Sequence, residues 1–192
     1  ALAGESATGV EYLLRCRGTG ESWTGSYNFA PLKDSDRRII GAVVTGRDVT
    51  AEKTAQQLLV EREARHRAIV ETASESIVVI DEHGTIQTVN PATEEIFGYS
   101  AGEIIGTNVK ILMAYPDSET HDRSLRDYRL TGNRRIIGVG RETIGRKRDG
   151  TLFPIDLAVA EWRDGTGRRD YTGIIRDVTL RKQTELALVE SR

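Results

Sequence analysis

The sequence predicts an α+β protein, in which strands and helices occupy separate stretches of the chain. Short apolar segments rich in β-branched residues form two groups along the 192 residues, and a segment rich in Ala, Leu, Glu and Arg follows each group. The second group opens with two strand segments, continues with helices and ends with three more strand segments. The tetrapeptide Arg-Asp-Val-Thr occurs at residues 47–50 and again at 176–179, each time between a last strand and a helix. This recurrence indicates an internal repeat.

The first group of strand segments is predicted to form a meander. Residues 10–16, 21–30 and 39–49 are strand-like, and glycine-containing or polar stretches separate them. Residues 50–72 contain neither glycine nor proline, so we expect one helix there, capped by Thr50.

This helix carries a weak coiled-coil pattern. Ala55, Leu59, Ile69 and Ala73 lie near a 3.5-residue repeat, although Arg62 and His66 occupy the intervening positions. The pattern predicts a connector helix that contacts another helix along one side.

The second group begins with a predicted hairpin, formed by residues 77–80 and 85–89 around the turn Asp-Glu-His-Gly. Helical segments follow: one at 92–97 that Asn90 caps and Gly98 ends, short turns within 102–113, and a longer helix over 118–130 that Gly132 ends. The remaining segments are predicted to be strands at 136–144, 152–162 and 171–179 and a closing helix at 180–192.

Composition and charge exclude several classes of function. The formal net charge is −2 with both signs interspersed, and the short basic cluster 146–148 is typical of a solvated hairpin end, so we expect no nucleic-acid partner. Cys16 is the only cysteine, which favours a reducing, cytoplasmic location. No apolar run reaches the roughly 20 residues of a membrane span, so we expect no membrane segment in this chain.

No catalytic motif is visible in the sequence. The three histidines, His66, His83 and His121, are spread along the chain, and there is no phosphate-binding glycine loop, Cys/His cluster or nucleophile motif. The sequence therefore predicts that this chain is not itself an enzyme.

From Ala64 to Thr179 the chain resembles the PAS family of sensory domains. The motifs that carry the resemblance are Ile80-Asp-Glu-His-Gly84, Asn90-Pro-Ala92, Phe97-Gly-Tyr99, Arg148-Asp-Gly-Thr151, Phe153-Pro154 and Arg176-Asp-Val-Thr179. The resemblance implies a PAS fold, in which a five-stranded antiparallel sheet with flanking helices encloses a ligand pocket.

The resemblance also divides the chain. Residues 1–50 look like the C-terminal part of a first PAS domain, because only its last three strands are present, and an unpaired sheet edge is then expected. Residues 51–73 are expected to be a connector helix, residues 74–179 a complete PAS sensor domain, and residues 180–192 an exit helix.

Within the PAS family the chain is most similar to the haem-containing oxygen sensors of the FixL type, which are histidine kinases. The matching segments are Asn108-Val109, Ile111-Leu-Met113, His121-Asp122, Tyr128-Arg129, Ile136-Ile-Gly-Val-Gly-Arg141 and Phe153-Pro154. The resemblance implies that His121 is the ligand of a haem b iron and that the domain senses O₂ or another diatomic gas. A surface histidine or a local helix cap is the alternative reading of His121.

The residue pattern fits this implication. A single neutral imidazole binds ferrous haem and leaves the opposite position open for a gas. Leu125 and Tyr128 follow His121 by four and seven positions, so the three share one helical face that points toward the pocket. The apolar wall that haem needs is expected from Ile136, Ile137, Val139, Leu157 and Val159.

Arginines provide the expected polar contacts. Arg141 is predicted to donate hydrogen bonds to bound gas or to pair with a haem propionate, and its alternative is a solvent-facing strand residue. Arg129 and Arg135 are candidates for holding propionates. The sequence departs from the family at Asp127, where relatives carry a basic residue, and at Ser124, where relatives carry an aromatic one.

Two alternatives to haem remain. The segment 106–113 lacks the cysteine that light-oxygen-voltage photoreceptors use, which excludes photo-adduct formation but leaves noncovalent flavin binding open. The second alternative is a ligand-free PAS module for dimerisation and signal relay. In either case Leu58, Leu59, Leu186 and Val189 predict a parallel homodimer through the two helices, and the resemblance implies a histidine kinase output domain in the parent chain.

Overall fold

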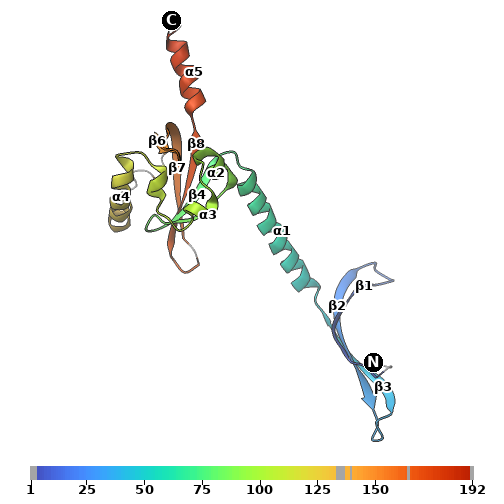
Figure 1. Cartoon of the computed structure of the whole chain (residues 1–192). Coiled ribbons are helices and arrows are strands. Elements are labelled where there is room, and N and C mark those ends of the chain that lie inside the picture. Colours follow the sequence, from blue (N-terminus) through green and yellow to red (C-terminus); the bar gives the residue numbers. More distant parts are fainter. Residues whose placement is uncertain (1–3, 133–136, 139, 164, 191–192) are drawn as a thin grey trace. The chain divides into compact units, whose positions relative to one another are not determined.

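The computed structural model describes residues 4–132, 137–138, 140–163 and 165–190 (Figure 1). The chain divides into two compact units between His66 and Arg67. Each unit is described by itself. The predicted domain division at residues 50, 73 and 179 stays a proposal.

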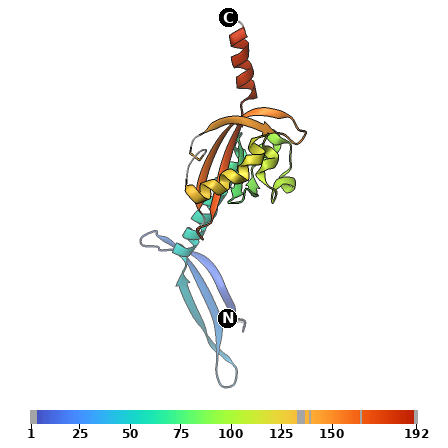
Figure 2. The ribbon, with the colours of Figure 1, turned by 90° about the vertical axis from the view of Figure 1, so that its left-hand side faces the viewer.

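The first unit is built on a three-stranded antiparallel meander, as predicted. Strands β1 (Ala7–Arg15), β2 (Ser22–Lys33) and β3 (Ile39–Asp48) pair in the order β1-β2-β3, side by side in Figure 2. The ring of Tyr27 lies across Gly25 and Gly46, where an added Cβ would come within 2.4 and 2.5 Å of ring atoms, so a side chain at either position would displace the ring.

Both outer strands of this sheet have an unpaired edge in the described part of the chain. No strand borders β1 or β3 on its outer side, and apolar side chains such as Leu13 and Ile40 are 77% and 63% exposed. The open edge that the sequence predicts is therefore confirmed.

The helix over 50–72 is confirmed as α1 (Thr50–Thr72), but its predicted cap is wrong. The carboxylate of Asp48, not Thr50, accepts the first free N–H, at 2.9 Å from the nitrogen of Thr50. The hydroxyl of Thr50 instead accepts a hydrogen bond from the N–H of Thr24 on β2 at 2.7 Å. An aspartate two residues before the helix thus satisfies the orphan donor.

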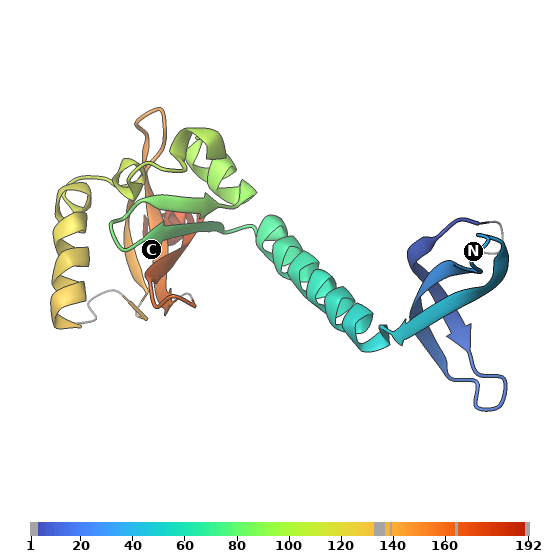
Figure 3. The ribbon, with the colours of Figure 1, turned by 90° about the horizontal axis from the view of Figure 1, so that it is seen from below.

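The second unit contains the predicted five-stranded antiparallel sheet, in the order β5-β4-β8-β7-β6. Its strands are β4 (Ser76–Asp81), β5 (Ile86–Val89), β6 (Arg141–Arg146), β7 (Leu152–Arg163) and β8 (Arg169–Asp177). Between β5 and β6 lie α2 (Pro91–Phe97), α3 (Ala101–Ile104), the 3₁₀ turn η1 (Val109–Leu112) and α4 (Asp117–Thr131). Figures 2 and 3 show α4 lying alongside the sheet.

Local signals placed most helix ends correctly. Asn90 accepts the N–H of Thr93 and begins α2, while Gly98 and Gly132 adopt left-handed backbone angles at the ends of α2 and α4. The amide of Asn90 also donates to the carbonyl of Val70 at 3.2 Å, which fastens the last turns of α1 to the core of this unit.

The prediction of one continuous strand over 136–144 is wrong. β6 begins only at Arg141, and Gly138 before it adopts a left-handed φ of +80° that no continuous strand accommodates. Ile137 forms an isolated bridge to Val159 instead of extending β6. Ile136 and Val139 lie outside the described residues.

The repeated tetrapeptide makes the same junction in both units. Asp177 accepts the N–H of Thr179 at 2.8 Å, as Asp48 does for Thr50, and α5 (Thr179–Glu190) begins there. The carbonyls of the buried residues Val49 and Val178 accept the first helical hydrogen bonds, each at 3.0 Å. β3 and β8 are therefore equivalent strands of an internal structural repeat.

Candidate functional site

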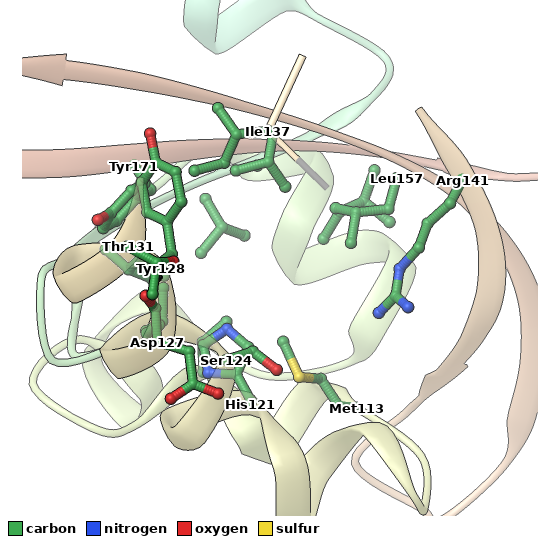
Figure 4. Close-up of a pocket in the computed structure, with 17 residues that line it drawn as sticks. Met113, His121, Ser124, Asp127, Tyr128, Thr131, Ile137, Arg141, Leu157 and Tyr171 are labelled. Atoms are coloured by element: carbon green, nitrogen blue, oxygen red, sulfur yellow. Dashed lines mark hydrogen bonds between the residues drawn. The ribbon is translucent and has the colours of Figure 1, made fainter. Parts of the chain in front are cut away.

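A cavity of about 320 Å³ lies in the second unit between α4 and the sheet. This volume falls at the lower end of the roughly 300–1,000 Å³ of small-molecule sites. Most of the residues that line it are apolar, and Figure 4 shows side chains of α4, β6, β7 and β8 around it.

Five of the residues that the sequence nominated line this cavity together: His121, Ile137, Arg141, Leu157 and Val159. Leu125 and Tyr128 line it on the same helix as His121, as their spacing predicts.

Of the other nominated residues, the structure describes Arg129. Arg129 does not line the cavity, and its Nη1 atom lies 3.9 Å from the carboxylate of Glu82. Arg135, Ile136 and Val139 lie outside the described residues.

His121 presents a neutral imidazole. Its side chain is 17% exposed, and burial lowers its pKa below the ordinary value of 6.5, although the neighbouring carboxylate of Asp122 acts in the opposite direction. A neutral imidazole has a free nitrogen lone pair at neutral pH, which is the form that ligates metals.

The carboxylate of Asp122 lies near the Nδ1 side of this imidazole. The Nδ1 atom of His121 lies 3.7 Å from Asp122 Oδ1, and Asp122 is held by Lys110 Nζ at 2.6 Å and by Asn108 Nδ2 at 3.3 Å. The hydrogen bond from Lys110 is the main reason that the pKa of Asp122 is lowered, so the carboxylate is charged. At 3.7 Å the two groups are too far apart for a hydrogen bond, so Asp122 acts on the imidazole through its charge.

Gly84, in the turn between β4 and β5, permits this placement of His121. Its φ is +83°, and an added Cβ would stand 3.4 Å from both His121 Cε1 and Leu125 Cδ1. The sequence identified Gly84 as a turn residue but gave no signal that α4 packs against it.

Arg141 enters the cavity wall from β6 and is paired. Its Nη2 atom lies 2.8 Å from Asp117 Oδ2, at the start of α4, and the hydroxyl of Thr143 donates to the same oxygen at 2.8 Å. The sequence analysis missed Asp117, because 24 residues separate the pair and no local pattern connects them.

Tyr171 is a second residue that the sequence analysis missed. It is 1% exposed on β8, and its ring meets that of Tyr128 edge to face with centroids 6.2 Å apart. The hydroxyl of Tyr128 donates to the carboxylate of Glu161 on β7.

Three buried polar atoms with no hydrogen-bond partner in the described part of the chain belong to residues that line this cavity. They are His121 Nδ1, Arg141 Nε and the hydroxyl of Tyr171. Buried polar atoms are seldom left unpaired in native proteins, so their gathering around one cavity is typical of a ligand site.

Ser124, Asp127 and Thr131 also line the cavity, from the exposed side of α4. Asp127 is the departure from the FixL-type pattern noted above, and it places an exposed carboxylate among the lining residues. A negatively charged ligand group is repelled there.

No helix within the described ranges has the length and apolarity that a bilayer crossing requires. Among the same residues, no cluster of three or more His, Cys, Asp or Glu side chains is arranged to hold a metal ion.

The sequence matches a protein-family model and also individual histidine kinases and sensor proteins. Residues 64–178 match the family model described as the PAS fold. The chain is 43% identical over 143 residues to the sensor protein FixL of Bradyrhizobium diazoefficiens, covering 74% of this chain and 28% of that protein. It is 29% identical over 141 residues to the cell-division control histidine kinase PdhS of Brucella anthropi, covering 71% of this chain and 13% of that protein.

Solved structures show the same fold. The PAS domain of an HTR-like protein from Haloarcula marismortui superposes with a TM-score of 0.55 at 24% identity, covering 65% of this chain and 98% of that one. An RNA-binding light-oxygen-voltage receptor superposes with a TM-score of 0.51 at 16% identity, covering 100% of this chain and 84% of that one. With more than half of its length matched by the family model, the chain belongs to the PAS family and is a sensory domain related to sensor histidine kinases.

Proposed function

We propose that the second unit binds haem b through His121 and senses O₂ or another diatomic gas. The observation that carries the proposal is a largely buried, neutral imidazole in the wall of a mainly apolar cavity, in which His121 is the one His or Cys among the described lining residues. One histidine holds iron when a porphyrin supplies the remaining equatorial ligands. The similarity to the sensor protein FixL supports the same assignment.

Different residues of the chain would hold the haem and contact the gas. Haem b, when bound, supplies a ferrous iron that binds diatomic gases. His121 would provide the nitrogen that holds the iron, with the charged carboxylate of Asp122 beside its ring. Ile137, Leu157 and Val159 would exclude water from the cavity, and Arg141 would donate hydrogen bonds to a polarised gas molecule.

The proposal is tested by titrating the ligand-free chain with hemin. We expect a sharp Soret band that saturates at one hemin per chain and shifts on reduction and addition of CO. Absorption that stays that of unbound hemin contradicts the proposal and favours a ligand-free relay module. A chain that instead retains a flavin chromophore supports the flavin alternative, toward which the light-oxygen-voltage neighbour points only through its fold.

We further propose that the signal leaves the cavity through β6 and α5. Glu142 follows Arg141 on β6, and its carboxylate lies 2.6 Å from Arg181 Nη2 and 2.6 Å from Lys182 Nζ, both in the first turn of α5. Movement of the Arg141 strand is thereby coupled to the helix that would lead to a histidine kinase output domain in the parent protein.

Replacement of Glu142 by glutamine is expected to loosen the start of α5. The ion pairs are solvent-exposed and individually weak, so we expect amide hydrogen exchange in the first turn of α5 to become roughly twofold to fivefold faster. Glu185→Gln is the matched control, because Glu185 contacts Arg181 at 3.8 Å within α5 alone. Equal exchange rates in the two variants would contradict the coupling.

We also propose a parallel homodimer through α1 and α5. Leu58, Leu59, Leu186 and Val189 are 61%, 66%, 64% and 72% exposed, so their apolar surface is available to a second copy.

Leu59→Glu is expected to weaken this dimer at least about tenfold, since a charge enters an apolar helix contact. Sedimentation at about 50 µM measures the effect, a concentration suited to weak interfaces. Gln57→Glu adds the same charge at a polar position of α1 and should leave the dimer unchanged. A monomeric unmodified chain at this concentration counts against the dimer.

A further inference from the structure

The helix α4 forms one wall of the cavity and packs less deeply than the wall formed by the sheet. None of its described residues is fully buried, whereas Tyr171 and Ile175 of β8 are 1% and 6% exposed. The cavity lies at the lower end of the size range for small-molecule sites, and haem is a rigid plate that cannot fold to pass a narrow mouth. Admission of such a ligand requires one wall to move, and α4 is the wall that gives up the least burial.

Tyr128 fastens the second half of α4 to the sheet. Its hydroxyl donates a hydrogen bond to Oε2 of Glu161 on β7. The side chain of Glu161 is 17% exposed, compared with 28% for Asp117 and 43% for Asp122, the two carboxylates that fasten the first half of the helix. Solvent therefore screens the Glu161 contact less than the other two.

The carboxylate of Glu161 is held from the sheet side. Its Oε1 atom lies 3.6 Å from Arg163 Nε and 3.6 Å from Arg169 Nε, while its Oε2 atom accepts the hydrogen bond from Tyr128. Arg163 belongs to β7 and Arg169 to β8. The acceptor thus stays with the sheet when α4 moves.

Tyr171 provides a second hydroxyl beside the same carboxylate. It lies directly opposite Glu161 in the ladder of β7 and β8, so the two side chains leave the sheet on the same face, roughly 5 Å apart at Cβ. Burial raises the pKa of Tyr171, and the charge of Glu161 raises it further, against the effect of Arg169. The hydroxyl is buried and has no hydrogen-bond partner within the described ranges. It is a donor that can bond to Glu161 when Tyr128 leaves.

We propose that Glu161 and its two alternative donors, Tyr128 and Tyr171, form a latch that controls the entry of the ligand. Tyr128 holds the carboxylate while α4 is closed, and Tyr171 takes it over when the second half of α4 moves away from the sheet. Because the carboxylate keeps a hydroxyl donor in both arrangements, opening costs less than it would with one donor. The identity of the ligand rests on the haem-based function proposed above, whereas the latch is a property of the ligand-free chain.

Tyr128→Phe is expected to open α4 more often in the ligand-free chain. The variant loses the closed-state hydrogen bond and keeps the ring that packs against Tyr171. One such hydrogen bond changes an equilibrium by roughly twofold to tenfold, so amide hydrogen exchange in the last two turns of α4 should become faster by about that factor. Exchange in β7 and β8 is the internal reference. Equal acceleration in these strands would mean a general loss of stability and would overturn the latch.

Tyr171→Phe is expected to have the opposite effect. It removes a hydroxyl that has no partner in the closed arrangement within the described ranges, so only the open arrangement loses a hydrogen bond. Exchange in the last two turns of α4 should become slower by roughly twofold to tenfold. Tyr115→Phe is the matched control, because Tyr115 is 77% exposed and does not line the cavity. Unchanged or faster exchange in Tyr171→Phe contradicts the exchange of donors.

Replacement of Glu161 by alanine tests whether both tyrosines act through this carboxylate. In the Glu161→Ala background, neither Tyr128→Phe nor Tyr171→Phe should alter exchange in α4. An effect of the same size with and without Glu161 would assign the two tyrosines to ordinary packing and overturn the latch.

Hemin association connects the latch to the haem-based function. If opening of α4 limits entry, Tyr128→Phe should accelerate hemin association and Tyr171→Phe should slow it, each by the factor found in hydrogen exchange. Stopped-flow absorbance at the Soret band measures these rates. Rates that stay unchanged while exchange changes would show that the ligand enters elsewhere, which overturns the latch as a control of entry. If the unmodified chain gives no Soret band, the haem-based function fails, and hydrogen exchange in the ligand-free chain decides on the latch alone.

Discussion

The His121→Ala variant is expected to lose five-coordinate haem binding altogether while keeping the PAS fold. The imidazole is the proposed iron ligand, and no second His or Cys lines the cavity in the described part of the chain to replace it. Because His121 packs at the cavity wall and not in the apolar core, the free energy of unfolding of the haem-free chain should change by only about 1 kcal/mol. Hemin titration followed at the Soret band measures the loss, and circular dichroism verifies the fold.

His83→Ala is the control for this variant. His83 lies in the turn before Gly84, its side chain is 67% exposed, and it does not line the cavity. Its replacement should leave hemin affinity and spectrum unchanged. If the His121 variant instead binds hemin with the affinity and spectrum of the unmodified chain, His121 is not the ligand and the haem site proposed here is wrong.

Replacement of Arg141 by alanine has the second largest expected effect. A hydrogen bond from a charged donor is worth about 1.5 to 3 kcal/mol, which corresponds to roughly a tenfold to hundredfold change in affinity. O₂ bound to haem at the proposed site would carry partial negative charge and should dissociate faster by that factor, whereas CO would be bound with far less charge separation and should be affected much less. Arg141→Ala is therefore expected to narrow the discrimination between O₂ and CO.

Stopped-flow dissociation rates for both gases provide the measurement. Arg146→Ala is the control on the same strand, since Arg146 is exposed and its guanidinium donates to the carbonyl of Ile111, away from the cavity. An equal change in both rates, or none, would make Arg141 a structural strand residue.

The sequence was most informative where structure depends on neighbouring residues. Asn90, Gly98 and Gly132 determine helix ends through their own backbone and side-chain chemistry, so those ends were predicted correctly. The spacing of His121, Leu125 and Tyr128 likewise identified one face of α4 as a cavity wall.

Where several sequence signals or distant residues compete, the predictions were wrong or incomplete. Thr50 is a good capping residue, yet Asp48 fills that role because β3 brings its carboxylate to the helix start. The apolar residues around Gly138 resemble a strand, but the left-handed glycine interrupts it. Asp117 and Tyr171 reach the site only through tertiary packing, which no spacing rule for a single segment encodes.

The Asp-Val-Thr junction ties the base of α5 directly to β8, so a small tilt at the base moves the far end of the helix by a larger distance. Val178, which is 3% exposed, is the single residue between β8 and the helix, and Asp177 is hydrogen-bonded to the first helical N–H. A helix of 12 residues extends about 18 Å, so a tilt of about 5° at its base displaces its far end by about 1.6 Å. Displacements of about 1–2 Å are the size by which helices at subunit interfaces exchange one packing for another. A change in the sheet too small to alter its hydrogen bonds is thus geometrically amplified at the point where α5 leaves the domain.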